Sequence, residues 1–245
     1  MTTPKLDGGE TLALTFSLLL SQLIFLFISF FVLVIMDALV AGNGFASFTT
    51  GSWTNPVFAA LHTQSPLVTF GAACASGLVL YLYAAWSQKR GMRNENVRQE
   101  ILTSRQGIAG EMSRLPLPLI IILMTIVGFS EELLFRFLLL GTLFAVLSPL
   151  CGSILAAGIS IVISSIVFCL VHVFNNGSGP IITWLILGMV LGAVFILTEN
   201  LAAVMLAHTF YNIAVLISAR VEMHRNPDYF GGPIPTKVLI DSEDA

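Results

Sequence analysis

The sequence predicts an all-α polytopic membrane protein, built as a bundle of six to seven transmembrane helices. Of its 245 residues, 56% are hydrophobic and 10% are charged, whereas a soluble domain carries about 25% charged residues. The mean hydropathy is +0.89, and the apolar residues gather in runs that reach the length of about 20 residues needed to cross a bilayer. We therefore expect an integral, multi-pass protein in the lipid bilayer. The location we expect for it is the cytoplasmic membrane of a prokaryote.

The apolar runs divide the chain into four regions. We expect an N-terminal two-span region (1–87), a basic cytoplasmic loop (88–114), a helical core (115–219) and a polar, mobile and peripheral C-terminal tail (220–245). The first run is longer than the apolar part of a signal peptide, which has about 7–15 residues, so we expect a retained anchor. The predicted spans cover residues 11–36, 66–86, 115–150, 153–174, 181–197 and 201–219.

The region 88–114 is the densest cluster of basic residues in the chain. It holds six basic residues and three glutamates, which places it in the cytoplasm by the positive-inside rule. We interpret it as a solvated loop, with a surface helix on anionic lipid as the alternative. The net charge of −3 gives no indication of a nucleic-acid partner, and we expect none.

Three ionisable residues lie inside the apolar run 115–150, namely Glu131, Glu132 and Arg136. A charge at the centre of a bilayer costs on the order of 2.5–3.5 kcal/mol even on lenient scales, so such residues pair with one another or carry function. Glu132 and Arg136 are four residues apart and share a helix face, where they can form an ion pair. Glu131 is rotated by about 100° from its neighbour and is left as a candidate general base.

Two later spans supply groups that can stand opposite these charges. His172 follows Phe168 by one turn, and His208 and Asn212 share one face of the last span. A carboxylate can take a proton from water, an imidazole can orient that water, and an amide can stabilise an oxyanion. Structural alternatives are an ion-pair clamp and hydrogen bonds between helices. The combination favours an active site inside the bundle.

The run 115–150 presents a topological problem. Its 36 residues would form a straight helix of about 54 Å, against a hydrocarbon core of about 30 Å. Bringing His172 to the depth of the glutamates favours a break near Gly128 and seven segments. Arg220 and Arg225 follow the last span, and basic residues favour the cytoplasmic side. Because the basic loop is also placed in the cytoplasm, this requires an even number of crossings after the loop. We expect the break, with a re-entrant arm over 115–130 as the arrangement that satisfies both arguments.

Three short motifs resemble those of a known family. They are Glu131-Glu132-x-x-x-Arg136, Phe168-x-x-x-His172 and His208-x-x-x-Asn212, in this order. Over residues 115–219 the chain resembles the CPBP family, the CAAX-protease and bacteriocin-processing intramembrane proteases also called ABI proteins, which are related to the Rce1-type prenyl-protein endopeptidase. The resemblance implies a glutamate-dependent endopeptidase acting on a membrane-associated peptide or protein, either a prenylated CAAX protein or a leader-bearing one.

The resemblance also implies roles for single residues. Glu131 resembles the base that activates water, His172 the residue that positions it, and Glu132 with Arg136 a supporting pair. His208 and Asn212 resemble the couple that stabilises the oxyanion. Many members have Gly directly after the motif arginine, where this chain has Phe137, and we expect that difference to affect the local bend rather than the chemistry.

Cofactors and other functions remain as alternatives. The resemblance favours a mechanism without a metal, and the chain has no His-Glu-x-x-His sequence. A zinc site through Glu131, His172 and His208 is the alternative. A non-proteolytic scaffold or immunity protein of the same fold and a proton-coupled transporter are the alternative functions, the latter without the internal repeats typical of such folds.

Overall fold

The structure, a computed structural model, describes residues 6–39, 54–176, 181–226 and Tyr229. Within these ranges the chain is helical and contains no strand, which confirms the predicted fold class. The elements are α1 (Gly8–Leu39), α3 (Asn55–Leu61), α4 (Pro66–Gly91), α5 (Glu95–Gln106), α6 (Ile108–Met112), α7 (Leu117–Glu132), the π-helical segment η2 (Leu133–Leu140), α8 (Gly141–Cys151), α9 (Ser153–Asn176), α10 (Ile181–Thr198) and α11 (Leu201–Arg225).

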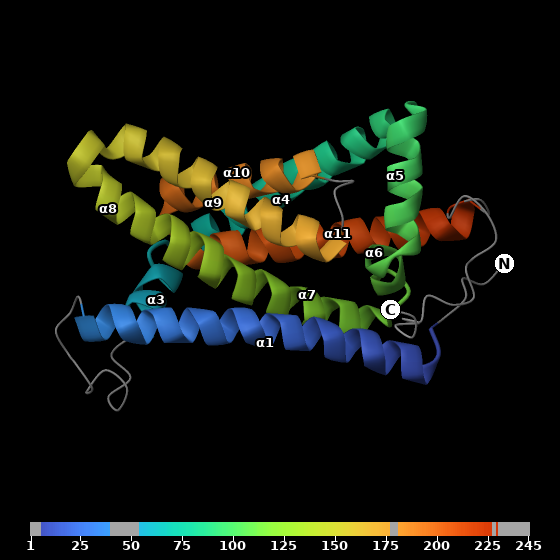
Figure 1. The fold of residues 1–245 in the computed structure, drawn as a ribbon, viewed down its shortest axis with the longest axis horizontal. Helices are drawn as coiled ribbons and strands as arrows, with labels where there is room; N and C mark the ends of the chain where they lie inside the picture. The colour runs from blue at the N-terminus through green and yellow to red at the C-terminus, as the bar shows by residue number, and fades with distance from the viewer. Residues whose placement is uncertain (1–5, 40–53, 177–180, 227–228, 230–245) are drawn as a thin grey trace, which may run out of the picture.

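Six stretches of the described chain are long and apolar enough to span a membrane. They are formed by α1, by α4, by α7 with η2 and α8, and by α9, α10 and α11. The spans run side by side along the long axis of the molecule, and α11 packs against α4, α7 and α10 (Figure 1). The chain is thus an integral, multi-pass membrane protein with six candidate spans.

The predicted break near Gly128 is wrong, because residues 117–151 form one continuous helical stretch. Gly128 lies instead where α7 meets α11. A Cβ atom built on Gly128 would lie 2.9 Å from the Met205 carbonyl oxygen and would overlap the Thr209 hydroxyl. The missing side chain therefore allows the two backbones to approach closely.

A hairpin brings His172 back to the depth of Glu131 without a break. The chain runs about 20 residues from Glu131 to the end of α8, turns at Gly152, whose φ of 81° suits glycine, and returns about 20 residues along α9. The two arms are each about 30 Å long and run in opposite directions, so His172 lies at the same depth as Glu131. Four candidate spans follow the basic region among the described residues, which agrees with the even number of crossings that Arg220 and Arg225 favour.

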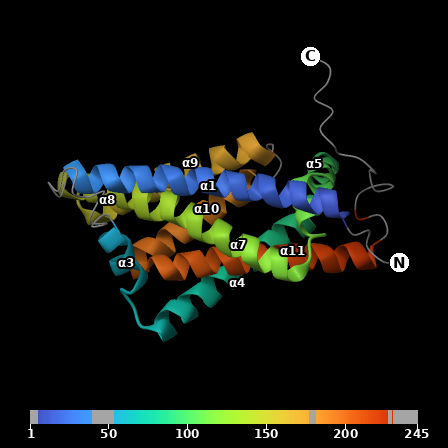
Figure 2. The same cartoon turned by 90° about the horizontal axis from the view of Figure 1, so that it is seen from below.

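The basic region connects the spans α4 and α7 and contains the helices α5 and α6, which resembles the alternative of a surface helix more than an open loop. Helix α5 lies crosswise to the spans at the end of the bundle where α4 and α11 end (Figures 1 and 2). Its Arg105 is buried, donates to Glu222 and to the Tyr229 carbonyl, and lies 4.1 Å from the centre of the Tyr229 ring. This contact ties α5 to the end of α11.

The expectation of a mobile tail from residue 220 is also wrong for the part that the structure describes. Helix α11 continues to Arg225, and Arg220 donates to the carbonyl oxygens of Ser113 and Leu115. Tyr229 is buried. Residues 230–245 lie outside the described residues.

Candidate active site

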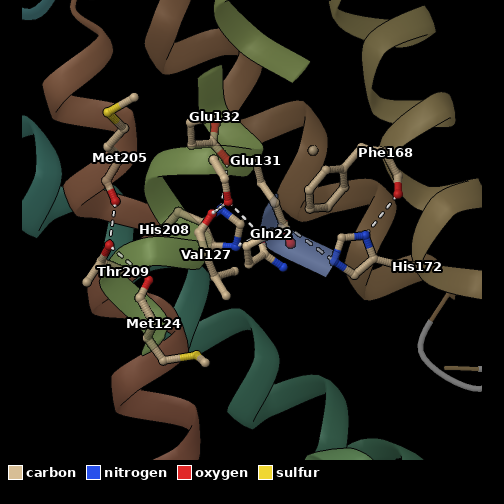
Figure 3. A network of polar contacts seen from close by, with 12 residues as sticks. Gln22, Met124, Val127, Glu131, Glu132, Phe168, His172, Met205, His208 and Thr209 are labelled. Atoms are coloured by element: carbon tan, nitrogen blue, oxygen red, sulfur yellow. Dashed lines mark hydrogen bonds and ion pairs between the residues drawn. The ribbon is translucent and has the colours of Figure 1, made fainter. Parts of the chain in front are cut away.

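The candidate site lies where α7, α9 and α11 meet, with α1 alongside (Figure 3). Phe168 on α9 is fully buried at its centre and connects two of the motifs. The Arg136 guanidinium lies 4.4 Å from the centre of its ring, and the His172 ring lies 4.2 Å away. An aromatic ring accepts a cation on its face, so Phe168 separates the buried charge from the histidine while packing against both.

Glu132 is buried between two positively charged or polar partners. Its Oε2 atom lies 3.1 Å from Nε of Arg136, and its Oε1 atom lies 2.7 Å from Nδ1 of His208. All three side chains are at most 2% exposed. A carboxylate buried in apolar surroundings is stable only when it is paired in this way, so Glu132 serves as the structural anchor that joins α7 to α11.

Glu131 faces the two histidines rather than the arginine. Its Oε2 atom lies 3.7 Å from Nε2 of His172 and 4.0 Å from Nε2 of His208. These separations are too long for direct hydrogen bonds, but a single water molecule can lie within hydrogen-bond distance of two atoms separated in this way. The side chains therefore surround a point suited to a reacting water.

The tautomers of His172 and His208 follow from the hydrogen bonds of their Nδ1 atoms. Nδ1 of His172 lies 2.9 Å from the Phe168 carbonyl oxygen, which only accepts, so this nitrogen carries the proton. Nδ1 of His208 donates in the same way to the Glu132 carboxylate. In their neutral forms both imidazoles consequently present the lone pair of Nε2 towards Glu131.

The π-helical segment η2 begins directly after the two glutamates. The Gly141 amide donates to the Arg136 carbonyl, five residues before it. Ser164 on α9 donates to the Phe135 carbonyl inside the segment at 2.8 Å. π-helical turns occur frequently at functional sites, and here the turn takes the place of the bend expected beside Phe137, which packs against buried apolar residues.

The side chains of the site differ in exposure. The His172 side chain is 18% exposed, that of Glu131 is 7% exposed and that of Glu132 is inaccessible. His172 is therefore the most exposed of these three side chains. A hollow of about 870 Å³, lined mostly by apolar residues of 151–163, lies at the turn between α8 and α9, remote from the glutamates.

Five of the six predicted site residues come together. Asn212 does not join them: it lies one turn beyond His208, half-buried, and the part of the chain that the structure describes gives it no hydrogen bond. The histidine expected to act with Asn212 is held by Glu132 instead. The residues brought together are Glu131, Glu132, Arg136, His172 and His208.

Sequence reasoning missed two residues at the site. Gln22 of α1 is buried and accepts a hydrogen bond from Ser130, the residue before Glu131. Trp184 of α10 has its ring centre 5.5 Å from that of His172. Gln22 could have been found from the sequence, because it is a glutamine inside a charge-free span and a buried amide needs a hydrogen-bond partner.

No group of three His, Cys, Asp or Glu side chains within the described residues is arranged to hold a metal ion. Zinc ligands lie about 2.0–2.2 Å from the metal. Ligands around such a centre are about 3.3–3.5 Å apart, slightly less than the 3.7 and 4.0 Å that separate Oε2 of Glu131 from Nε2 of His172 and of His208.

Comparison with known proteins gives one match. Residues 113–214, which contain all three motifs, match the family model described as type II CAAX prenyl endopeptidase Rce1-like. No curated protein and no solved structure matches the chain. The family match confirms the resemblance carried by the three motifs.

Proposed function

We propose that residues 113–214, which belong to the Rce1-like family, form the catalytic region of an intramembrane endopeptidase. The observation that carries the proposal is the position of Glu131, whose Oε2 atom faces Nε2 of both His172 and His208 within the bundle. A carboxylate beside two oriented imidazoles is an arrangement for general acid–base catalysis.

In the proposed reaction Glu131 takes a proton from a water held between its carboxylate and His172. The water oxygen attacks the carbonyl carbon of the scissile peptide bond, and the carbonyl oxygen becomes an oxyanion. The proton then passes from Glu131 to the amide nitrogen as the C–N bond breaks. The products are a peptide with a new carboxyl end and a peptide with a new amine, and Glu131 returns to its starting state.

His208 is the proposed stabiliser of the oxyanion. This role requires a proton on Nε2, so that His208 donates Nδ1–H to Glu132 and Nε2–H to the oxyanion. Glu132 and Arg136 hold the ring in place from the buried side. Asn212 joins in only if substrate binding brings its amide to the oxyanion.

The proposed substrate class is supported by the description of the matching family. The Rce1-like description points to prenylated CAAX proteins, and a leader-bearing membrane peptide is the second candidate. The test incubates the purified chain with a panel of farnesylated CAAX peptides and leader peptides and identifies products by mass. We expect cleavage of at least one class by the wild type and by Glu95→Gln, an exposed control, and none by Glu131→Gln.

The proposed reaction needs no metal. Cleavage should persist after chelation, and the purified chain should lack stoichiometric zinc. Zinc in a 1:1 ratio together with loss of cleavage on chelation would replace the general-base role of Glu131 by a ligand role through Glu131, His172 and His208.

The alternative functions predict different results. A scaffold or immunity protein would keep its partner binding in Glu131→Gln and would cleave nothing in the panel. A proton-coupled transporter would drive substrate uptake into vesicles with a pH gradient. We place the chain in the cytoplasmic membrane of a prokaryote, with α5 on the cytoplasmic side, because the basic residues gather at that end.

A further inference from the structure

A cationic hollow lies at the junction of α4 and α5, away from the glutamates. It has a volume of about 610 Å³ and is lined by Trp86, Lys89, Arg90, Arg93 and Asn94. All five side chains come from the last turns of α4 and the short connection to α5. The hollow therefore belongs to the end of the bundle that carries the basic region (Figure 1).

The positive charges in this hollow have no carboxylate partner among the residues that the structure describes. Among the described residues the structure records no ion pair for Lys89, Arg90 or Arg93. The nearest glutamate in the sequence, Glu95, accepts instead from Arg98 and Gln99. Three cations without a carboxylate partner favour an anionic ligand.

An apolar strip leads along α4 to the hollow. Leu78, Leu82 and Trp86 are spaced four residues apart on one face, and each is more than half exposed. From Leu78 to Trp86 the strip is about 12 Å long, close to half of a hydrocarbon core of about 30 Å. Arg90 follows one turn later on the same face and lies 5.4 Å from the centre of the Trp86 ring.

The order of these features matches one leaflet of a membrane. An apolar strip of acyl-chain length ends at an aromatic side chain of the kind found at the membrane interface, and cations lie beyond it. A free anion would need the cations but not the exposed strip. The continuity of the two favours a lipid over a soluble phosphate.

We propose that the hollow binds the phosphate headgroup of an anionic phospholipid, whose acyl chain lies along Leu78 and Leu82. Arg90 and Arg93 donate to phosphate oxygens and Lys89 adds a point charge. Each basic residue near an anionic membrane surface contributes a preference of about fivefold. The proposal is independent of the chemistry at Glu131.

The test uses the full chain in phosphatidylcholine vesicles that contain a small share of acyl-brominated phosphatidylglycerol or acyl-brominated phosphatidylcholine. Bromine quenches a nearby tryptophan, and the contribution of Trp86 is the difference between the wild type and Trp86→Phe. We expect the brominated phosphatidylglycerol to quench Trp86 several-fold more than the zwitterionic lipid. The ratio should fall to about one when Lys89→Gln, Arg90→Gln and Arg93→Gln are combined.

A matched pair of variants separates the site from general surface charge. Arg93→Gln and Arg98→Gln each remove one exposed positive charge from neighbouring turns, but only Arg93 lines the hollow. We expect the first to lower the quenching ratio and the second to leave it unchanged. Equal quenching by the two lipids, an unchanged ratio in the triple variant, or loss of the preference on adding inorganic phosphate would each overturn the lipid assignment.

Discussion

The Nδ1 atom of His208 lies 2.7 Å from Oε1 of Glu132, so the last span, α11, is joined to α7 by a buried hydrogen bond. The second oxygen of Glu132 faces Arg136 at 3.1 Å. One carboxylate thus orients the histidine and neutralises the arginine. Glu131, the adjacent residue, can face Nε2 of His172 and of His208 because its neighbour meets both structural needs.

Replacing Glu132 with Gln should destabilise the protein strongly. The change leaves the Arg136 guanidinium without a counter-charge in the interior, and breaking a buried pair costs about 3–5 kcal/mol. We expect a large drop in the melting temperature of the purified protein. Adding Arg136→Met should recover much of the loss because the unpaired charge is gone. Equal melting temperatures for Glu132→Gln and the wild type would contradict the role of the pair.

Replacing Gly128 with Ala should loosen the contact between α7 and α11. The new methyl group would meet the Thr209 hydroxyl and the Met205 carbonyl, and overpacking of this kind costs about 1–3 kcal/mol. Gly158→Ala is the matched control, since a Cβ atom there meets nothing within 4 Å. Thermal unfolding of both variants compares them. A control that is destabilised as much as Gly128→Ala would argue against the close approach.

Gln22→Leu should slow cleavage while leaving a folded protein. Ser130 loses its partner on α1, and a small displacement of a catalytic group can reduce a rate by up to about a hundredfold. We expect kcat to fall by about tenfold with little change in KM. Ser29→Ala is the control on the same helix, because the buried Ser29 hydroxyl has no partner among the described residues. An unchanged kcat in Gln22→Leu would contradict a role of α1 in positioning the residues of the site.

Arg105→Ala should free the end of α11 from α5. The guanidinium is buried and contacts Glu222 as well as the Tyr229 carbonyl and ring. Loss of charged hydrogen bonds of this kind costs about 1.5–3 kcal/mol. The exposed pair of Arg98 and Glu95 is the comparison, since surface pairs contribute about 0–1 kcal/mol. Thermal unfolding should therefore separate Arg105→Ala from Arg98→Ala, and equal effects would contradict the buried contact.

The fold and most of the candidate site follow from the sequence because both depend on spacing within a helix. Long apolar runs predict spans, and the four-residue separation of Glu132 and Arg136 predicts their pairing. Spacing along one helix does not predict which side chains of a neighbouring helix it will contact. The contact of His208 with Glu132, the packing at Gly128 and the hydrogen bond of Gln22 with Ser130 all join different spans, so single-helix patterns could not predict them.

The topology also depends on packing between helices, which the pattern within a single helix does not predict. We predicted a break near Gly128 because the depth of His172 was counted from the start of the span. In the structure the hairpin at Gly152 has two arms of equal length, and these return His172 to the depth of Glu131. Arg220 and Arg225, which follow the last span, predict an even number of crossings without any knowledge of packing, and four candidate spans follow the basic region. Helix α11 extends past its apolar part because Arg220 and Glu222 find partners at the end of the bundle.

The rate of peptide cleavage by Glu131→Gln tests the central claim most directly. Glutamine keeps the size of the side chain but cannot accept a proton from water. If Glu131 is the general base, the rate should fall by about a hundredfold or more relative to the wild type, with an unchanged melting temperature and with Glu95→Gln fully active. A folded Glu131→Gln protein that cleaves its substrate at the wild-type rate would contradict the account.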